Sequence, residues 1–514
     1  MSDVILDAAV AVAVGRAQNP EIKDWLVRRR KAGHRNWLYV AQQSEMLQLL
    51  ILESEREITS NPGAAARDQL GSLQQSCLWL AALADDGDTL SDSDPVAAGL
   101  TRAASRVGND TRIVTDNPSR LERGLPFISL DSAIAEELVA GPIPLVDLRA
   151  QQDRLRAGLE RSLHRVLHHG KFIQGPEIHA LEGELAEYVG VEYCIGVASG
   201  TDALLIALMA LEIGPGDEVV TTPFSFIATA EMIALVGATA VFADVDPRTG
   251  NLDAARLEPA ITRRTRAILP VSLYGQCANM TEINEVAQRH QLPVIEDAAQ
   301  SFGALHRGKK SCALSTIGCT SFFPAKPLGA YGDAGAIFTS DTDLARIMRE
   351  LLNHGQDGHY QHVRLGVNGR MDSMQAAVLR EKLSILDDEL TQRQLLADRY
   401  NELLQELAGR AGLNLPFVLA ENRSAWAQYT VQINHRDRVR HCLLEAGIPS
   451  AVHYPMVLFH QPAFQQSISN CPHSVRLAAK VMSLPIHPYL EAETQHTVVE
   501  HLKRVLGQEI RGVV

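Results

Sequence analysis

The sequence predicts an α/β fold built from two units, each containing a largely parallel sheet. Short apolar runs alternate with helical patterns, most clearly from residue 143 to about residue 340. Such alternation indicates parallel strands with helices on both faces of the sheet. Several runs end in an acidic residue or a glycine-containing turn, at the carboxyl edge of the sheet, where ligands bind in folds of this kind.

Length and composition limit the class of protein. With 514 residues the chain is too long for a single core, and about three domains are expected. A content of 46% hydrophobic and 21% charged residues is typical of a soluble globular protein. The formal net charge of −13 argues against nucleic acid as the main partner of the whole molecule, although not against a single basic patch.

The cysteines and the apolar runs indicate the cellular compartment of the protein. The 7 cysteines are scattered and form no CxxC pair, which favours reduced thiols over disulfides or a zinc site. The apolar start of the chain carries Asp3 and Asp7 and lacks the basic region of a signal peptide. No apolar run reaches membrane-spanning length, so we expect a cytoplasmic protein without a membrane partner.

The first unit is predicted over residues 1–135, followed by a linker over 136–142. Segments 3–7 and 111–116 each have the pattern of a short strand that ends in a carboxylate. Helical patterns lie between them, so a small α/β unit with parallel strands is expected. The strand-terminal acids would gather at one edge of its sheet.

Four acids of this unit, Asp7, Glu45, Asp94 and Asp116, resemble in their order the acidic set of PIN-type nuclease domains. The resemblance implies a PIN-like domain that holds Mg²⁺ or Mn²⁺ and activates water against a phosphodiester. Nucleic acid is therefore a possible partner of this domain only. The match departs from the family in the apolar residues 8–10 after the first acid, and Asp94 could instead be a helix N-cap and Glu45 part of a solvated helix face.

In the second unit, a strand-to-helix turn could hold a phosphate. Cys194 to Ala198 has the pattern of a buried strand, and Ser199 to Asp202 turns directly into a helix from Ala203 to Leu211. Unpaired backbone N–H groups at a helix start bind anions, and Gly200 allows close approach. An ordinary turn would favour the same residue types.

A second strand end carries Asp297, the last residue of the run Pro293 to Asp297. A carboxylate at the floor of a cleft could pair with a heterocyclic N–H⁺ and keep that nitrogen protonated. The alternative for Asp297 is a helix N-cap.

The segment 321–338 places Lys326 between an apolar run that has the pattern of a strand and a glycine-broken turn. An ammonium at a buried strand end is disfavoured by desolvation, which makes the nucleophilic amine accessible near neutral pH. Pro327 keeps the lysine in extended geometry. A surface lysine with a buried stem is the alternative.

Together these features resemble the nucleotide-sugar aminotransferases of the DegT/StrS type. The resemblance covers about residues 143–510 and rests on Phe172 to Pro176, Ser199 to Leu204, Gly214 to Val219, Glu296 to Gln300 and the lysine segment. It implies the three-layer fold type I aminotransferase, with a mostly parallel sheet in a large domain over 143–395 and a small α+β domain over 396–514. It also implies pyridoxal 5′-phosphate as cofactor.

The resemblance further assigns roles around the cofactor ring. Lys326 would hold the cofactor covalently and move the proton between cofactor and substrate carbon. The related dehydratases have histidine at this position, so the lysine implies amino transfer. Asp297 would bind the pyridine nitrogen, Gln300 the ring hydroxyl, and Phe226 would stack on the ring.

The phosphate of the cofactor would be held by Gly200, Thr201 and Ser321. In the family an asparagine of the partner subunit completes this site, and Asn368 matches it. A homodimer with shared active sites is therefore implied.

For the substrate, the segments Phe323 to Gly329, Pro270 to Gln276 and Val452 to Pro455 resemble the branch that aminates UDP-linked 3-keto hexuronic acids. This resemblance implies L-glutamate as amino donor and a role in surface-polysaccharide or secondary-metabolite sugar biosynthesis. Arg370, His453 and Tyr454 would bind the sugar, and the guanidinium of Arg370 suits a carboxylate or a diphosphate. The alternative for Arg370 and His453 is a structural ion pair. An NDP-4-keto-6-deoxy sugar is the competing substrate. A different class remains open, in which the first domain acts as a metal-dependent RNase and the second is regulatory.

Overall fold

In this computed structural model, residues 143–464 and 470–510 are described, together with the strands of a 5-stranded sheet near the start of the chain. The chain divides into two compact units, Met1–Gly141 and Pro142–Val514. The division falls inside the segment 136–142 that the sequence predicts as a linker.

The sheet of the first unit has the strand order β3-β2-β1-β4-β5. Its strands are β1 (Val4–Leu6), β2 (Leu38–Val40), β3 (Leu49–Ile51), β4 (Arg112–Val114) and β5 (Phe127–Ile128). β1 pairs in parallel with both β2 and β4, β4 pairs in parallel with β5, and only the β2–β3 pair is antiparallel. This pairing agrees with the predicted parallel sheet.

The predicted metal ligands of this unit, Asp7, Glu45, Asp94 and Asp116, lie outside the described residues. The metal site and the PIN-like assignment therefore stay predictions. Within the part of the chain that is described, no group of histidine, cysteine and acidic residues could hold a metal ion.

The sheet of the second unit consists of a 4-stranded part, β10-β13-β14-β6, and a 3-stranded part, β8-β7-β9. Parallel bridges from Ile268 to Val294 and from Val271 to Asp297 join β9 to β10. The pairing is parallel throughout, except that β14 is antiparallel to both β13 and β6. The strands are β6 (Tyr193–Val197), β7 (Glu218–Thr221), β8 (Thr239–Phe242), β9 (Thr265–Leu269), β10 (Ile295–Asp297), β13 (Ile317–Ser321) and β14 (Gly335–Thr339).

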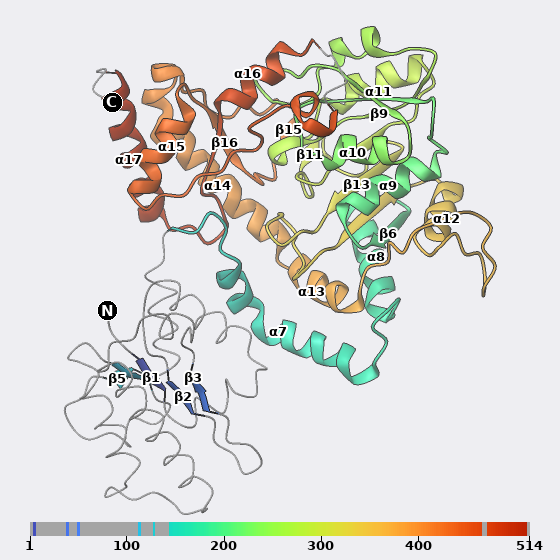
Figure 1. The fold of residues 1–514 in the computed structure, drawn as a ribbon, viewed down its shortest axis with the longest axis horizontal. Coiled ribbons are helices and arrows are strands. Elements are labelled where there is room, and N and C mark those ends of the chain that lie inside the picture. The colour runs from blue at the N-terminus through green and yellow to red at the C-terminus, as the bar shows by residue number, and fades with distance from the viewer. Residues whose placement is uncertain are drawn as a thin grey trace, which may run out of the picture. The chain divides into compact units, whose positions relative to one another are not determined.

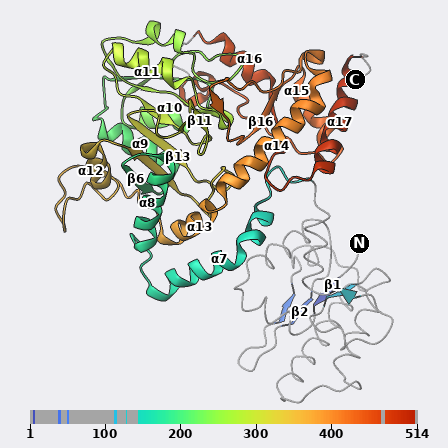
Figure 2. The same ribbon diagram turned by 180° about the vertical axis from the view of Figure 1, so that it is seen from behind.

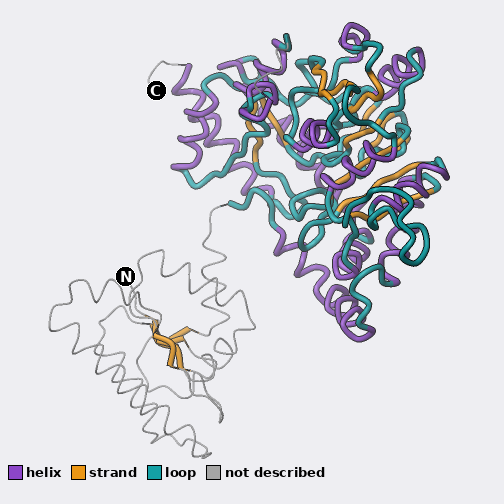
Figure 3. The backbone as a smooth tube through the Cα atoms, turned by 45° about the vertical axis from the view of Figure 1, so that its right-hand side comes forward, coloured by secondary structure: helices purple, strands orange, loops and turns teal. Residues whose placement is uncertain are grey.

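Helices cover both faces of this sheet. Neighbouring residues of a strand point to opposite faces, so each face has its own core cluster. On β6, Ile195 and Val197 share a core cluster with residues of α9 (Gly200–Ala210), α10 (Ala228–Leu235) and α12 (Thr342–Leu351). Cys194 belongs to the cluster of the other face, with α8 (Pro176–Val189) and α13 (Ser373–Leu383). Figure 1 shows these helices around the strands, and Figure 3 shows the strands enclosed by helices. The predicted three-layer α/β arrangement is confirmed.

The helix α7 (Leu148–His169) precedes the sheet and has local signals at both ends. Asp147 accepts a hydrogen bond from the N–H of Ala150 at 2.9 Å, which caps the start. Gly170 ends the helix with φ 69°, a conformation that favours glycine. From the sequence, the amphipathic pattern from Leu155 to Val166 predicts the core of this helix, and Gly170 predicts its end.

The last part of the chain forms a separate core around the antiparallel pair β16 (Tyr429–Gln432) and β17 (Val481–Leu484). Tyr400 and Tyr429 are fully buried there, with ring centroids 4.7 Å apart. Tyr400 belongs to α14 (Leu386–Leu404), which runs from the region of α13 to that of α15 and α17 (Figure 2). The predicted domain boundary at residue 395 falls within α14 and stays a prediction.

The remaining elements are short or peripheral to the site. They are α11 (Met280–Arg289), α15 (Arg436–Glu445), α16 (Pro472–Lys480), α17 (Ala492–Ile510) and the antiparallel strands β11 (Leu305–His306), β12 (Lys309–Lys310) and β15 (Asn422–Arg423). Of the helices in the described ranges, none is long and apolar enough to cross a membrane.

Candidate active site

Three strand ends meet at one edge of the large sheet. β6 and β13 both run antiparallel to β14, and β10 is parallel to β13, so β6, β10 and β13 point the same way. Their carboxyl ends lead into Gly200, Asp297 and Ser321. The edge therefore brings together residues that are far apart in the sequence, as expected for a ligand site in an open α/β sheet.

The start of α9 lies directly against the end of β13. A side chain added at Gly200 would place its Cβ 2.6 Å from the Cβ of Ser321, so only glycine fits there. Ser199 caps the helix, because its Oγ accepts a hydrogen bond from the N–H of Asp202 at 3.0 Å. The first N–H groups of α9, at Gly200 and Thr201, have no partner within the helix and suit a phosphate.

Asp297 ends β10 and is buried, with 5% of its surface exposed. Its Oδ2 accepts a hydrogen bond from the hydroxyl of Thr229 at 2.8 Å, and its Oδ1 accepts one from the N–H of Ala299 at 3.1 Å. Burial raises the pKa of Asp297, while these two bonds and the charge of Lys326 oppose the rise. The carboxylate is thus fixed in orientation and faces a cation.

Lys326 lies in the connection between β13 and β14, and not at a strand end as the sequence suggested. β13 stops at Ser321, and Pro324, shortly after it, has no N–H to continue the ladder. The turn is closed by hydrogen bonds from the N–H of Lys326 to the carbonyl of Phe323, at 2.9 Å, and from Ala330 to Phe322, at 2.7 Å.

The amine of Lys326 has the environment expected of a nucleophile. Desolvation lowers the pKa of Lys326, and the carboxylate of Asp297 acts in the opposite direction. A larger fraction of neutral amine is then present near pH 7 than for an exposed lysine. The predicted nucleophilic character of Lys326 therefore depends on its burial and not on a position at a strand end.

Gln300 joins the sheet edge to the segment around residue 454. Its Oε1 accepts a hydrogen bond from the N–H of Tyr274 at 2.9 Å, and its Nε2 donates one to the hydroxyl of Tyr454 at 3.0 Å. The hydroxyl of Tyr274 donates to the carbonyl of His453. Gln300, which is predicted to bind the ring hydroxyl of the cofactor, therefore forms a hydrogen bond with Tyr454, which is predicted to bind the sugar.

Phe226 and His453 border the same site. The ring of Phe226 is 54% exposed and lies 6.0 Å from that of Tyr454, tilted by 41°. The Nδ1 of His453 lies 3.0 Å from the hydroxyl of Ser483. Burial, followed by the positive charge of Lys326, lowers the pKa of His453 to about 4. His453 is therefore a neutral side chain at neutral pH and lies within range of the charge on Lys326.

Asn368 and Arg370 lie on a segment beside the start of α9. The carbonyl of Gly369 accepts a hydrogen bond from the N–H of Ala198 at 2.8 Å. Arg370 donates to Oδ1 of Asn353 at 2.6 Å, and its Nε is buried without a partner. Asn368 is exposed, and its backbone forms a bridge with Asn353.

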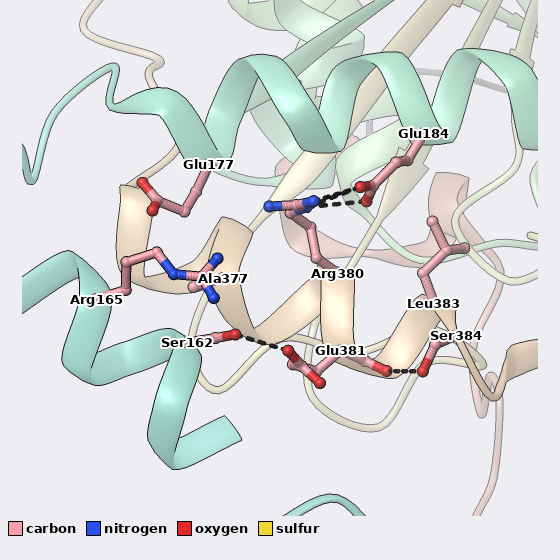
Figure 4. Close-up of a pocket in the computed structure, with 9 residues that line it drawn as sticks. All are labelled: Ser162, Arg165, Glu177, Glu184, Ala377, Arg380, Glu381, Leu383 and Ser384. Carbon is pink, nitrogen blue, oxygen red and sulfur yellow. Dashed lines mark hydrogen bonds and ion pairs between the residues drawn. The ribbon is translucent and has the colours of Figure 1, made fainter. Parts of the chain in front are cut away.

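A cavity of about 350 Å³ lies elsewhere, between α7, α8 and α13 (Figure 4). Two of its lining side chains, Arg380 and Glu184, already form a two-pronged ion pair, and Ser162 donates to Glu381 at 2.6 Å. None of the predicted site residues lines this cavity. It is therefore distinct from the candidate active site.

Three residues that position the site were not foreseen. Thr229 orients Asp297, Tyr274 holds Gln300 and the backbone of His453, and Glu296 fixes the end of β10. Buried Glu296 accepts hydrogen bonds from the hydroxyls of Ser272 and Ser311 at 2.7 and 2.9 Å. Only Glu296 had a signal in the sequence, as a second acid beside Asp297.

Comparison with known proteins gives the same picture of the second unit. The DegT/DnrJ/EryC1/StrS aminotransferase family matches residues 154–503. The chain is 52% identical over 349 residues to the UDP-2-acetamido-2-deoxy-3-oxo-D-glucuronate aminotransferase of Pseudomonas aeruginosa, a match that covers 68% of this chain and 96% of that protein.

Two solved structures are also similar. One is a DegT DnrJ EryC1 StrS aminotransferase from Brucella abortus, with TM-score 0.69, 42% identity and coverage of 71% of this chain and 100% of that chain. The other is ntda from Bacillus subtilis with bound cofactor PMP, with TM-score 0.66, 30% identity and coverage of 75% and 95%.

Proposed function

Because this chain belongs to the DegT/DnrJ/EryC1/StrS aminotransferase family, we propose that it transfers the amino group of L-glutamate to the keto carbon of a UDP-linked 3-keto hexuronic acid. Its relatives and structural neighbours are pyridoxal-phosphate-dependent sugar aminotransferases. The sugar is proposed from the Pseudomonas aeruginosa relative, whose name states a UDP-linked 3-oxo-glucuronate.

One observation carries the proposal: Lys326, Asp297 and the contact between Gly200 and Ser321 converge at one edge of the sheet. The residues present fit pyridoxal phosphate. The contact leaves no room for a Cβ beside the free N–H groups of α9, which suits a phosphate, and Asp297 offers a buried, oriented carboxylate to a protonated ring nitrogen.

The cofactor, when bound, supplies an electron sink for the bonds at the carbon that gains or loses the amino group. The chain's own residues then have separate tasks. Asp297 keeps the ring nitrogen charged, Gly200, Thr201 and Ser321 hold the phosphate, and Phe226 covers one face of the ring. Lys326 takes and returns the proton at its Nζ, which its lowered pKa allows near neutral pH.

The sugar would lie between Tyr454, His453 and Arg370. Neutral His453 can donate or accept a hydrogen bond without adding charge next to Lys326. The unpaired Nε of Arg370 is a donor still free for a carboxylate or a diphosphate.

The test is turnover with L-glutamate and a panel of UDP- and dTDP-linked keto sugars. We expect the highest kcat/KM with the UDP-3-keto hexuronic acid, and loss of the cofactor's visible absorption band in Lys326→Ala. A colourless wild-type protein, or an unchanged visible absorption band in Lys326→Ala, would refute the proposal. A clear preference for a 4-keto-6-deoxy sugar would replace only the substrate.

We also propose a homodimer in which Asn368 completes the partner's phosphate site. Exposed apolar side chains on two segments would be covered by a second copy: Phe172, Ile173, Val363 and Leu365 are 46%, 52%, 55% and 91% exposed. The first two lie against residues 372 and 373 through a backbone bridge and a hydrogen bond. Exposed apolar side chains of this size suit an interface.

A mixing experiment tests the shared site. Lys326→Ala and Asn368→Ala would each be nearly inactive alone, whereas hybrids contain one intact site, so random exchange should restore about a quarter of wild-type activity. No recovery in hybrids shown to form by mass spectrometry would mean that each site is built from one chain.

The nuclease function predicted for residues 1–135 stays a prediction. β1 and β4 are parallel neighbours, and Asp7 and Asp116 follow them in the sequence. Cleavage of RNA that needs Mg²⁺ or Mn²⁺ and disappears in Asp7→Asn and Asp116→Asn would support it. Full aminotransferase turnover without any cleavage would dispose of it.

A further inference from the structure

Lys382 is a buried cation without a hydrogen-bonding partner. It lies near the end of α13, is 1% exposed, and its Nζ makes no hydrogen bond. Instead the ammonium lies over the ring of Tyr331, 4.0 Å from the ring centroid. Burial lowers the pKa of Lys382 to about 8, against the opposing charge of Glu389. A buried lysine without a hydrogen bond lowers the stability of the fold, so its presence indicates a role other than packing.

Tyr331 belongs to the same turn as Lys326, between β13 and β14. α13 holds this turn at a second point through Gln375. The N–H of Tyr331 donates to Oε1 of Gln375 at 2.9 Å, and Nε2 of Gln375 donates to the carbonyl of Tyr331 at 3.3 Å. The backbone and the ring of Tyr331 are thus both fixed by side chains of one helix.

The opposing charge belongs to Glu389, a buried carboxylate at the start of α14 that acts on Lys382 without a hydrogen bond or ion pair to it. Glu389 accepts two hydrogen bonds from Nε2 of Gln151 in α7, at 3.0 and 2.8 Å, and one from the hydroxyl of Tyr489 at 2.5 Å. Tyr489 follows β17 of the last core. Glu389 therefore links α7 to the segment after β17 through hydrogen bonds, and it acts on Lys382 through its charge alone.

We propose that Lys382 is a positioning residue for the reaction: it fixes the ring of Tyr331 and thereby the turn that places the amine of Lys326 opposite Asp297. This inference rests on the proposed function, because only that function gives the placement of Lys326 a use. An ammonium over an aromatic face is attracted to it without a hydrogen bond. The contact also explains why the Nζ of Lys382 has no other partner.

The geometry suggests two matched pairs of variants. Lys382→Met removes the charge at similar length, whereas Lys382→Arg keeps a cation for the ring. Tyr331→Leu removes the aromatic face, whereas Tyr331→Phe keeps it and removes only a hydroxyl that is buried without a partner. Lys309→Met, at an exposed lysine, controls for the loss of one positive charge.

The first readout needs neither cofactor nor turnover. In the cofactor-free full chain, the rate at which Lys326 reacts with an amine-specific reagent is followed by mass spectrometry between pH 7 and 10. We expect Lys382→Met and Tyr331→Leu to change this rate at least about threefold near pH 8, because the distance from Lys326 to Asp297 changes. The arginine, phenylalanine and Lys309 variants should follow the wild-type profile.

The second readout is the separation of kcat from KM in the loaded enzyme. A misplaced amine should lower kcat about tenfold while the KM for L-glutamate stays within about twofold. If Lys382→Met only lowers the unfolding temperature, with the reactivity of Lys326 and kcat unchanged, the inference is wrong. If Lys382→Met does not fold, the labelling rate of Lys326 and kcat are compared between Tyr331→Leu and Tyr331→Phe, and equal values in these two variants would show that the inference is wrong. A wild-type enzyme without turnover refutes the proposed function, and the labelling profile still reports on the placement of Lys326.

Discussion

Thr229 donates its hydroxyl proton to Oδ2 of Asp297 across 2.8 Å, although the two residues are 68 positions apart in the chain. Thr229 is itself fully buried in α10, and its hydroxyl also lies 2.9 Å from that of Ser225. Two hydroxyls and the N–H of Ala299 thus form a small chain of polar groups around one carboxylate. Because both oxygens of Asp297 accept a hydrogen bond, the orientation of its carboxylate is fixed.

Thr229→Val should weaken cofactor binding about tenfold. The valine has nearly the same shape, so the loss is that of one hydrogen bond to a buried carboxylate, about 1.5 kcal/mol. The measurement is titration of cofactor-free protein with pyridoxal phosphate, followed by its absorption. Thr229→Ser keeps the hydroxyl and should bind like the wild type. Equal affinities of the valine and serine variants would show that the bond does not orient Asp297.

Gly200→Ala should both destabilise the protein and impair the phosphate site. The added Cβ would lie 2.6 Å from the Cβ of Ser321, so the end of β13 must move, at a cost of about 1–3 kcal/mol. Affinity for pyridoxal phosphate should fall at least about tenfold.

Gly183→Ala is the control for that substitution. It lies inside α8 with nothing within 4 Å of its Cβ, so alanine there should raise stability by about 0.5–1 kcal/mol. If both variants bind the cofactor like the wild type, the contact between Gly200 and Ser321 is not part of a phosphate site.

The local parts of the site could be predicted from the sequence. The strand before Ser199, the cap at that residue and the acid that ends β10 depend on periodicity and turn chemistry within a few residues. For Lys326 the same reasoning was partly wrong. It joined the lysine to the preceding strand, whereas β13 ends at Ser321 and Pro324 separates that strand from the lysine.

The contacts that complete the site could not be predicted, because they join distant segments. Gln300 meets Tyr454 across 154 positions, and the hydroxyl of Tyr274 reaches His453 across 179. Neither contact leaves a periodic signal in one sequence. The buried Lys382 is similar: only packing of α13 against the turn after β13 places its charge over Tyr331.

Acid should destabilise the second unit between about pH 6.5 and pH 4 through His487. Burial lowers the pKa of His487 to about 4, with Asp147 opposing and Arg393 acting in the same direction. The unfolded chain therefore binds the proton first as pH falls, and stability is lost through this window, by up to about 3 kcal/mol. The urea midpoint of the cofactor-free protein, measured from pH 7 to pH 4.5, reports this loss.

His487→Met should make that loss shallower, because both ring nitrogens of His487 are buried without a hydrogen bond and methionine cannot be protonated. His164→Met, at an exposed histidine, should leave the slope unchanged. Parallel curves for wild type and His487→Met would assign the acid sensitivity to other groups, among them His453, whose pKa is also lowered to about 4 by burial and by Lys326.

Gln300 and Tyr454 should be energetically coupled, which a double-mutant cycle measures. Gln300→Leu leaves the hydroxyl of Tyr454 and the N–H of Tyr274 without their partner, so its cost should be about 2 kcal/mol. Tyr454→Phe removes only the acceptor of the Gln300 amide and should cost about 1 kcal/mol. In the double variant the lost bond is counted once, so the total should fall short of the sum by about 1 kcal/mol.

Both the unfolding free energy of the cofactor-free protein and the KM for the sugar are measured. Additivity within about 0.3 kcal/mol in both would mean that the 3.0 Å contact carries no energy. Coupling in stability without an effect on KM would make Gln300 a link between segments, and Tyr454 would then have no part in binding the sugar.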